Sequence, residues 1–101
     1  MPEEAKEIAK QSDILYGKLT ADLSEDVASL KIQSIVQEIW QFIQKNSTNV
    51  SLGKPYMNML INAYSNDYIK TITDSKYKKG ASDYIAKAFR YYSENNALEN
   101  N

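Results

Sequence analysis

The sequence contains no cysteine and no histidine among its 101 residues. Without cysteine the chain can form neither a disulfide framework nor a thiol nucleophile, and without histidine it lacks the commonest general base of enzymes. The two absences also remove most ligand sets of zinc. The acidic pairs Glu3/Glu4 and Glu25/Asp26 are explained by expected helix starts, where negative charge is favourable. We therefore predict that the chain is not an enzyme, and we expect neither a metal site nor a cofactor.

Glycine is scarce, and long apolar runs are missing. The three glycines never cluster, so no glycine-rich phosphate loop is present. Asp67, Asp74 and Asp83 do not have the spacing of a calcium-binding loop. No apolar run approaches the roughly 20 residues of a membrane-spanning helix, and the N-terminus lacks the basic-then-apolar pattern of a signal peptide. We predict a cytoplasmic protein that does not contact a membrane.

Neither sign of charge dominates, because the chain has 12 lysine and arginine residues and 13 acidic residues, which gives a net charge of −1. Nucleic-acid-binding domains usually carry a basic excess. The cluster Lys70, Lys76, Lys78 and Lys79 is open to two interpretations, an anion-binding patch or a solvated loop, and we favour the loop. We expect no direct contact between this domain and nucleic acid.

Helical periodicity is the main positive signal. Hydrophobic residues make up 43% of the chain and charged residues 25%, which is typical of a globular domain. The clearest pattern follows Gly80, where residues at helical spacing share one face. These residues are Ala81, Tyr84, Ile85, Ala88, Phe89 and Tyr92. The pattern predicts a last helix with this face buried.

Two helices are predicted in the first half of the chain. The first begins with Pro2 at a helix-start position, and Gly17 is placed to end it. The second begins at the N-cap candidate Ser24 and stops near Asn46. We predict that this second helix is the longest and the most central. A loop through about Leu52 follows it.

Two shorter helices are predicted before the last one. The first has Pro55 in its first turn and begins at either Ser51 or Gly53. The second restarts at Asn66 and carries Tyr68. We therefore predict an all-α fold, a single compact bundle of about five helices. We expect residues 1–23 to form an N-terminal helix, residues 24–94 a helical core, and residues 95–101 a disordered tail.

Aromatic residues are abundant, with eight tyrosines, two phenylalanines and one tryptophan. Such side chains line clefts that are apolar in bulk and offer hydroxyl groups for orientation, but they also pack at the rims of ordinary cores. Both interpretations stay open for each tyrosine. The candidate lining of a cleft is Trp40, Tyr56, Met59, Tyr64, Tyr84 and Tyr91.

From Ser24 to Asn95 the chain resembles a known family, the TipAS-type antibiotic-recognition domain of MerR-family transcriptional activators. The segments that carry the resemblance are the tryptophan-containing helix from Ile35 to Phe42, the segment from Tyr56 to Tyr64 running into Asn66-Asp67-Tyr68, the glycine-led segment from Lys79 to Ile85, and the segment from Ala88 to Tyr92. The resemblance implies a globin-like helical arrangement with a cleft, parts of which order when a bulky drug binds. We therefore expect residues 24–94 to be the ligand-binding core and the N-terminal helix in residues 1–23 to be a candidate lid.

The resemblance also implies a function. The domain is expected to bind a bulky hydrophobic small molecule or peptide antibiotic, such as a thiopeptide, and to signal to a DNA-binding domain elsewhere in a regulator of multidrug resistance. Founding members of the family trap thiopeptides through a cysteine. Because this chain has none, only non-covalent binding is open to it. The alternative is a protein-interaction module that takes a partner helix in an aromatic groove.

Overall fold

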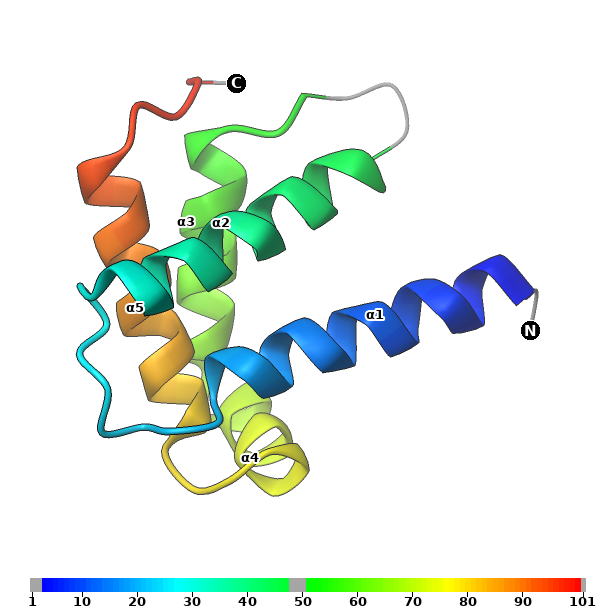
Figure 1. Ribbon diagram of the computed structural model, residues 1–101, viewed down its shortest axis with the longest axis vertical. Helices are drawn as coiled ribbons and strands as arrows, with labels where there is room; N and C mark the ends of the chain where they lie inside the picture. Colours follow the sequence, from blue (N-terminus) through cyan, green and yellow to red (C-terminus); the bar gives the residue numbers. More distant parts are fainter. Residues whose placement is uncertain (1–2, 48–50, 101) are drawn as a thin grey trace.

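The computed structural model describes residues 3–47 and 51–100. These residues form five helices and no strand: α1 (Glu3–Leu19), α2 (Leu30–Lys45), α3 (Lys54–Tyr64), α4 (Asp67–Lys76) and α5 (Ala81–Asn95) (Figure 1). The Cα radius of gyration is 13.3 Å, close to the roughly 13 Å of a compact domain of this length. The predicted all-α fold of about five helices in one compact body is confirmed. The expected roles of Pro2, of the loop residues 48–50 and of residue 101 fall outside the described residues.

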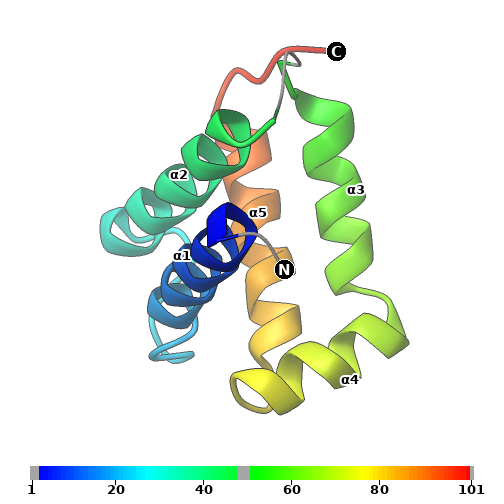
Figure 2. The ribbon, with the colours of Figure 1, turned by 90° about the vertical axis from the view of Figure 1, so that its right-hand side faces the viewer.

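Helix α5 is at the centre of the fold. It packs against α2, α3 and α4, and Figure 2 shows α2 and α3 on opposite sides of it. The six residues predicted to share its buried face are all at most 9% exposed. The prediction that the second helix is central and longest is wrong, because α2 has 16 residues against 17 in α1 and packs on one side of α5 only.

Helix α1 continues through Gly17 and ends at Leu19, so the predicted end at Gly17 is wrong. Leu19 is fully buried in the core, and its burial favours another half-turn of helix beyond the glycine. Thr20 then closes the helix, because its backbone N–H and its hydroxyl both donate to the carbonyl of Tyr16, at 3.1 and 2.8 Å. Tertiary burial therefore outweighs the local preference of Gly17.

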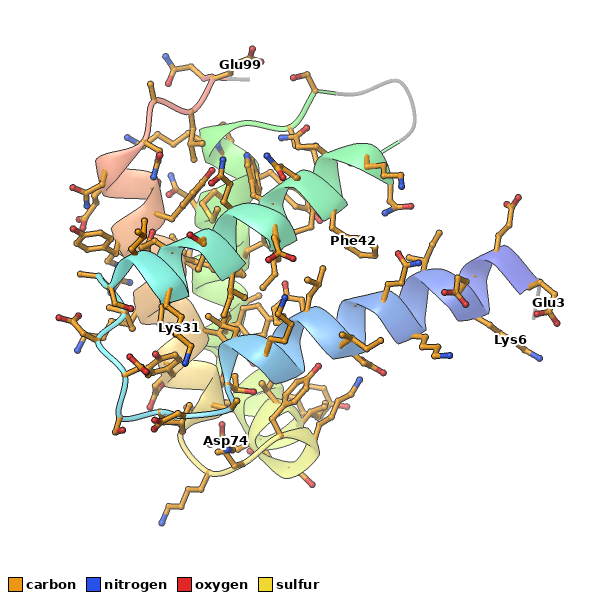
Figure 3. The ribbon with its side chains drawn as sticks, in the orientation of Figure 1. Glu3, Lys6, Lys31, Phe42, Asp74 and Glu99 are labelled. Carbon is orange, nitrogen blue, oxygen red and sulfur yellow. The ribbon has the colours of Figure 1, made fainter. Side chains whose placement is uncertain are left out.

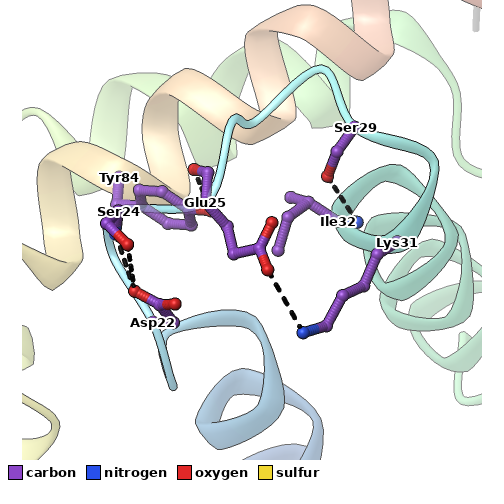
Figure 4. A network of polar contacts seen from close by, with 7 residues as sticks. All are labelled: Asp22, Ser24, Glu25, Ser29, Lys31, Ile32 and Tyr84. Carbon is purple, nitrogen blue, oxygen red and sulfur yellow. Dashed lines mark hydrogen bonds and ion pairs between the residues drawn. The ribbon is translucent and has the colours of Figure 1, made fainter.

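Ser24 does not cap a helix, which corrects the predicted start of the second helix. Helix α2 begins at Leu30, and its N-cap is Ser29, whose hydroxyl oxygen accepts from the backbone N–H of Ile32 at 3.2 Å (Figure 4). The Ser24 hydroxyl instead donates to the carboxylate of Asp22 at 2.6 Å, and the same oxygen accepts from the Ser24 backbone N–H. This local turn competes with helix formation, as such side chains commonly do.

The other predicted helix boundaries agree with the structure. Helix α2 ends with Asn46 as its C-cap, and α3 begins after Gly53, one of the two predicted starts, with a proline in its first turn. Asn66 caps α4 by accepting from the backbone N–H groups of Tyr68 and Ile69. Local capping chemistry therefore predicts these ends correctly.

The segment after α5 returns to the start of α3. Leu98 packs against the core. The carbonyl of Glu99 accepts from the backbone N–H of Lys54 at 2.6 Å, and its carboxylate accepts from the hydroxyl of Ser51 at 3.0 Å. Residues 97–100 have no regular secondary structure.

The N-terminal part of α1 extends away from the other helices (Figure 1). Ile8 and Ile14 on this helix are 41% and 53% exposed, whereas its last residue is fully buried. The helix therefore docks through its C-terminal part only. None of the helices in the described ranges is long and apolar enough to cross a membrane.

Candidate functional site

Aromatic side chains from four helices form two groups of ring contacts. The rings of Tyr16, Tyr64 and Phe89 form a triangle, with centroid distances of 5.9 Å between the two tyrosines, 6.2 Å from Tyr16 to Phe89 and 6.0 Å from Tyr64 to Phe89. Trp40 and Tyr56 form a second contact, with centroids 6.3 Å apart. We call these five residues the aromatic cluster. Its members come from α1, α2, α3 and α5, so only the tertiary fold assembles it.

Helix α3 supplies two members of the cluster because of its periodicity. Tyr56, Leu60 and Tyr64 follow one another at intervals of four residues, so they lie along one face of the helix. All three pack against the core and stay partly exposed. Met57 and Ile61 point more deeply and are 1% and 5% exposed. Helix α3 thus places Tyr64 against Tyr16 of α1 and Tyr56 against Trp40 of α2, while its adjacent face fills the core.

The cluster has a buried floor and a partly open surface. Phe89 and Trp40 are 1% and 7% exposed, whereas Tyr16, Tyr56 and Tyr64 are half-buried. Half-buried tyrosines offer ring area for apolar contact together with a hydroxyl group for orientation. The arrangement has the composition of a ligand-binding surface, mostly apolar with a few convergent polar groups.

Burial raises the pKa of two hydroxyl groups in the cluster, those of Tyr16 and Tyr64. It is the largest cause that raises the pKa of Tyr16 far above the ordinary 10.0, and the neighbouring Tyr64 adds to the rise through its charge and a side-chain hydrogen bond. Burial also raises the pKa of Tyr64, although the hydrogen bond with Tyr16 and the charge of Lys76 act in the opposite direction. Both groups therefore remain hydrogen-bond donors at physiological pH.

The N-terminal part of α1 borders two open hollows. One, of about 520 Å³, is lined by Lys6, Ala9, Lys10, Asp13 and Ile14. The other, of about 320 Å³, lies where α1 approaches the end of α2 and is lined by Glu4, Glu7, Ile8, Gln11, Lys45 and Asn46. In Figure 3, Glu3 and Lys6 mark the extended end of α1, and Phe42 extends from α2 on the side that faces α1. Solvent-accessible space thus flanks the least attached part of the fold.

Polar contacts between side chains attach the C-terminal part of α1. The ammonium of Lys76 in α4 lies 2.5 Å from the carboxylate of Asp13, and that of Lys18 lies 3.4 Å from the carboxylate of Glu38 in α2. All four side chains are about half exposed, so each pair contributes at most about 1 kcal/mol. Aromatic and apolar packing is therefore the main attachment of α1.

The six residues predicted to line a cleft do not all lie together. Trp40, Tyr56 and Tyr64 belong to the aromatic cluster. Met59 is 50% exposed on α3, and Tyr91 is half-buried on α5. Tyr84 is 8% exposed, and its hydroxyl donates to the carbonyl of Glu25 at 2.8 Å (Figure 4). The hydroxyl of Tyr84 therefore fixes the loop between α1 and α2.

Tyr16 and Phe89 are members of the cluster that the predicted lining does not include. Tyr16 lies near the end of the predicted first helix, and Phe89 lies on the predicted buried face of the last helix. A stripe shows which residues turn inward, but it does not show which residues of different helices meet. The pairing of Tyr16 with Tyr64 therefore has no signal in the sequence.

Acidic side chains do not converge near the cluster. Within residues 3–47 and 51–100, no group of three or more acidic, histidine or cysteine residues is placed to hold a metal ion. The surface around the cluster is thus suited to apolar contact and hydrogen bonding by neutral hydroxyls.

Comparison with known protein families identifies the family of the chain. The family model of the TipAS antibiotic-recognition domain matches residues 1–92. The chain belongs to this family. Neither a curated protein nor a solved structure matches the chain significantly. The TipAS match includes all four helices that supply the aromatic cluster, and it extends the resemblance found between Ser24 and Asn95 to the N-terminal helix.

Proposed function

We propose that this TipAS domain binds a bulky, largely apolar antibiotic, such as a thiopeptide, non-covalently at the aromatic cluster. The observation that carries the proposal is the meeting of half-buried tyrosines from α1 and α3 over a floor of Phe89 and Trp40. Flat apolar parts of a ligand would pack on these rings, and the tyrosine hydroxyls would orient its polar groups. Covalent capture by a thiol has no residue to support it.

We further propose that α1 is a lid. A bulky ligand at the cluster would displace or redirect the N-terminal part of α1, because that part has exposed apolar residues and hollows on two sides. On this proposal residues 1–23 close over the ligand and residues 24–94 form the binding core. An element that changes its order on binding can transmit occupancy to another domain.

The resemblance to regulators supports a wider proposal about context. We propose that the domain is a non-enzymatic sensor in a cytoplasmic MerR-type transcriptional activator, whose DNA-binding domain lies outside these residues. Its output would be expression of genes for multidrug resistance. A ligand can shift the regulator only through a difference in affinity between two states.

A titration tests the binding proposal. Thiopeptides and other bulky antibiotics are added to the domain while the fluorescence of Trp40, its single tryptophan, and the thermal stability are followed. A ligand present at 100 times its Kd raises the free energy of unfolding by roughly 2.7 kcal/mol. We expect a saturable change for at least one compound. No change for any compound would contradict the proposal.

Two matched variants place the ligand. Tyr56→Leu removes a ring that contacts Trp40, whereas Tyr68→Leu removes a ring on α4 that is 73% exposed and outside the cluster. We expect Tyr56→Leu to weaken binding roughly tenfold, which corresponds to a loss of about 1.4 kcal/mol of binding free energy. Tyr68→Leu should leave the affinity unchanged. Equal effects of the two variants would move the site away from the cluster.

Hydrogen exchange tests the lid. With the antibiotic that gives a saturable change, the backbone amides of the first two turns of α1 should exchange more slowly than in the free domain. The amides of α5 serve as the reference, because its buried face already protects them. Unchanged exchange in α1 at saturation would rule out the lid while leaving the binding proposal intact.

One observation favours a second function. The hollows beside α1 are open to solvent, and Ile8 and Ile14 at their edges are 41% and 53% exposed. Such a surface also suits a partner helix with an apolar face. If no antibiotic produces a change, a partner helix becomes the better proposal, and it predicts that Ile14→Asp abolishes partner binding.

A further inference from the structure

A polar groove lies on the other side of α3 from the aromatic cluster. It is a hollow of about 410 Å³ between α3 and α5, lined by Lys54, Asn58, Ile61, Asn62, Arg90, Ser93 and Glu94. Asn58 and Asn62 lie roughly half a turn around α3 from Tyr56 and Leu60, as the 3.6-residue period requires. We call this hollow the α3–α5 groove. A molecule bound there would not overlap a ligand at the cluster.

The two walls of the groove run in opposite directions. At one end, the hydroxyl of Ser82 near the start of α5 donates to the carbonyl of Tyr64 at the end of α3. At the other end, residues after α5 return to the N-terminus of α3. Asn58 and Asn62 are one turn apart on one wall, and Arg90 and Glu94 are one turn apart on the other. The order of the side chains along the groove follows, with Arg90 nearest the asparagines and Glu94 nearest Lys54.

The fold does not use the polar side chains of this groove. Among the described residues, the amides of Asn58 and Asn62, the guanidinium of Arg90 and the hydroxyl of Ser93 make no hydrogen bond or ion pair. Asn58, Asn62 and Arg90 are exposed to solvent. Their side chains are therefore available to a ligand without the loss of a contact inside the fold.

Arg90 is the single arginine of a chain with 12 basic residues. A lysine can balance charge on a surface, but the planar fork of a guanidinium also binds a carboxylate through two parallel hydrogen bonds. Lys70 and Lys76, by contrast, pair with the carboxylates of Asp83 and Asp13. Arg90 lines the groove, is exposed and makes no ion pair among the described residues, so its guanidinium is free to bind a carboxylate.

The asparagines indicate a peptide main chain. Each side-chain amide has one acceptor and a pair of donors, which complement the N–H and C=O groups of a peptide. Residues four apart on a helix are displaced by about 6 Å along its axis, and alternate residues of an extended chain are about 6.6 Å apart. Asn58 and Asn62 can therefore each contact one of two alternate peptide groups.

We propose that the α3–α5 groove binds an extended acidic peptide segment, with its main chain against Asn58 and Asn62 and one carboxylate on Arg90. The charged residues that line the groove are Lys54, Arg90 and Glu94, so positive charge exceeds negative charge there and favours an anion. This site is independent of the antibiotic site, and it gives a sensor domain a second contact through which a protein partner can bind.

Nuclear magnetic resonance of the full chain tests the proposal. The probe is an N-acetylated, C-amidated hexapeptide in which alanine and aspartate alternate, and the reference peptide has asparagine in place of each aspartate. The aspartate peptide should shift the side-chain resonances of Asn58, Asn62 and Arg90 in a saturable way. The reference peptide should bind roughly tenfold more weakly, because hydrogen bonds to charged groups are the stronger ones.

A pair of variants with equal net charge supplies the control. Arg90→Gln and Lys87→Gln each remove one positive charge from exposed positions on α5, but Lys87 does not line the groove. Arg90→Gln should abolish the shifts at the asparagines, and Lys87→Gln should preserve them. The proposal is overturned if both variants weaken binding equally, if the two peptides bind alike, or if no resonance of the groove shifts at millimolar peptide. The antibiotic titration above is unaffected by any of these outcomes.

Discussion

The ring of Tyr16 in α1 lies 5.9 Å from the ring of Tyr64 in α3, and each also contacts Phe89 in α5. Three helices that are distant in sequence therefore meet at one triangle of rings. Beyond this triangle, toward its N-terminus, α1 has mostly exposed residues. The same contact thus joins the least attached helix to the most buried one and forms the surface proposed to bind an antibiotic.

Replacing Tyr16 with alanine should loosen α1 without unfolding the core. Truncation of fully buried aromatic residues costs about 3 to 5 kcal/mol, and we expect about 2 kcal/mol here because Tyr16 is half-buried. Urea denaturation measures the loss. Ile8→Ala on the same helix is the control, since Ile8 is 41% exposed, and its effect should stay within about 0.5 kcal/mol. An equal loss in both variants would show that the ring triangle does not hold α1.

Two glycines should respond in opposite ways to alanine. Gly80 precedes α5 with φ of 92°, a left-handed conformation that side chains disfavour, so Gly80→Ala should cost about 1 to 2 kcal/mol. Gly17 lies inside α1, and a Cβ atom there would meet nothing within 4 Å. Gly17→Ala should stabilise the domain by up to about 1 kcal/mol. Melting temperatures that shift in the same direction for both would contradict this assignment.

The hydroxyl of Tyr84 should contribute to stability through a single hydrogen bond. Tyr84→Phe removes the donor to the Glu25 carbonyl and keeps the ring, so we expect a loss of about 1 kcal/mol. Tyr91→Phe on the same helix is the matched control and should change stability by less than about 0.5 kcal/mol. Chemical denaturation measures the free energy of unfolding of the two variants. Equal stabilities would contradict the prediction and show that water solvates the Glu25 carbonyl as well as the tyrosine hydroxyl does.

Asp74 should make stability depend on acid pH. Hydrogen bonds from the backbone N–H of Ser82, at 2.9 Å, and of Gly80 hold the pKa of Asp74 below its ordinary value of 3.8. Because the pKa of Asp74 is lower in the folded than in the unfolded state, its contribution to the stability of the fold is fully present above pH 3.8. That contribution is lost as the pH falls through the pKa of the folded state. Asp74→Ala should cost roughly 0.5 to 1 kcal/mol near neutral pH, because the group is near the surface.

Thermal melts at several pH values measure this dependence. The difference between the unmodified domain and Asp74→Ala should shrink as the pH decreases below 3.8. Asp74→Asn is the control, because its amide oxygen still accepts the backbone N–H groups but has no charge to titrate. A difference that stays constant into acid would show that the charge of Asp74 has no part in starting α5.

The helices could be predicted from the sequence wherever neighbouring residues alone determine the buried face or the cap. The face of α5 from Ala81 to Tyr92 follows from helical periodicity, and the caps Gly53 and Asn66 follow from backbone preferences. Errors arose where two local signals competed. Ser24 is as good a cap as Ser29 by residue type, but Asp22 engages it in a turn, and burial of Leu19 carries α1 past Gly17.

The candidate site was only partly predictable for a different reason. Periodicity shows that Trp40, Tyr56 and Tyr64 turn inward, but the partners of each ring depend on how the helices cross. Tyr84 and Tyr64 are both tyrosines that the sequence offers as lining residues. The hydroxyl of Tyr84, however, donates a hydrogen bond to the backbone carbonyl of Glu25. The groove at Asn58 and Arg90 has no local signal, because unpaired polar residues on helix surfaces are ordinary until two helices place them together.

The sequence by itself determined an all-helical domain of the TipAS family, since periodicity, caps and family pattern are properties of neighbouring residues. It also excluded thiol capture, because a missing residue type needs no structure to establish. Only the tertiary structure decided that Tyr16 meets Tyr64 and that Arg90 lies in a hollow with two asparagines. The physical reason is that contacts between helices depend on packing angles and burial, which are settled by the whole core and by no single segment.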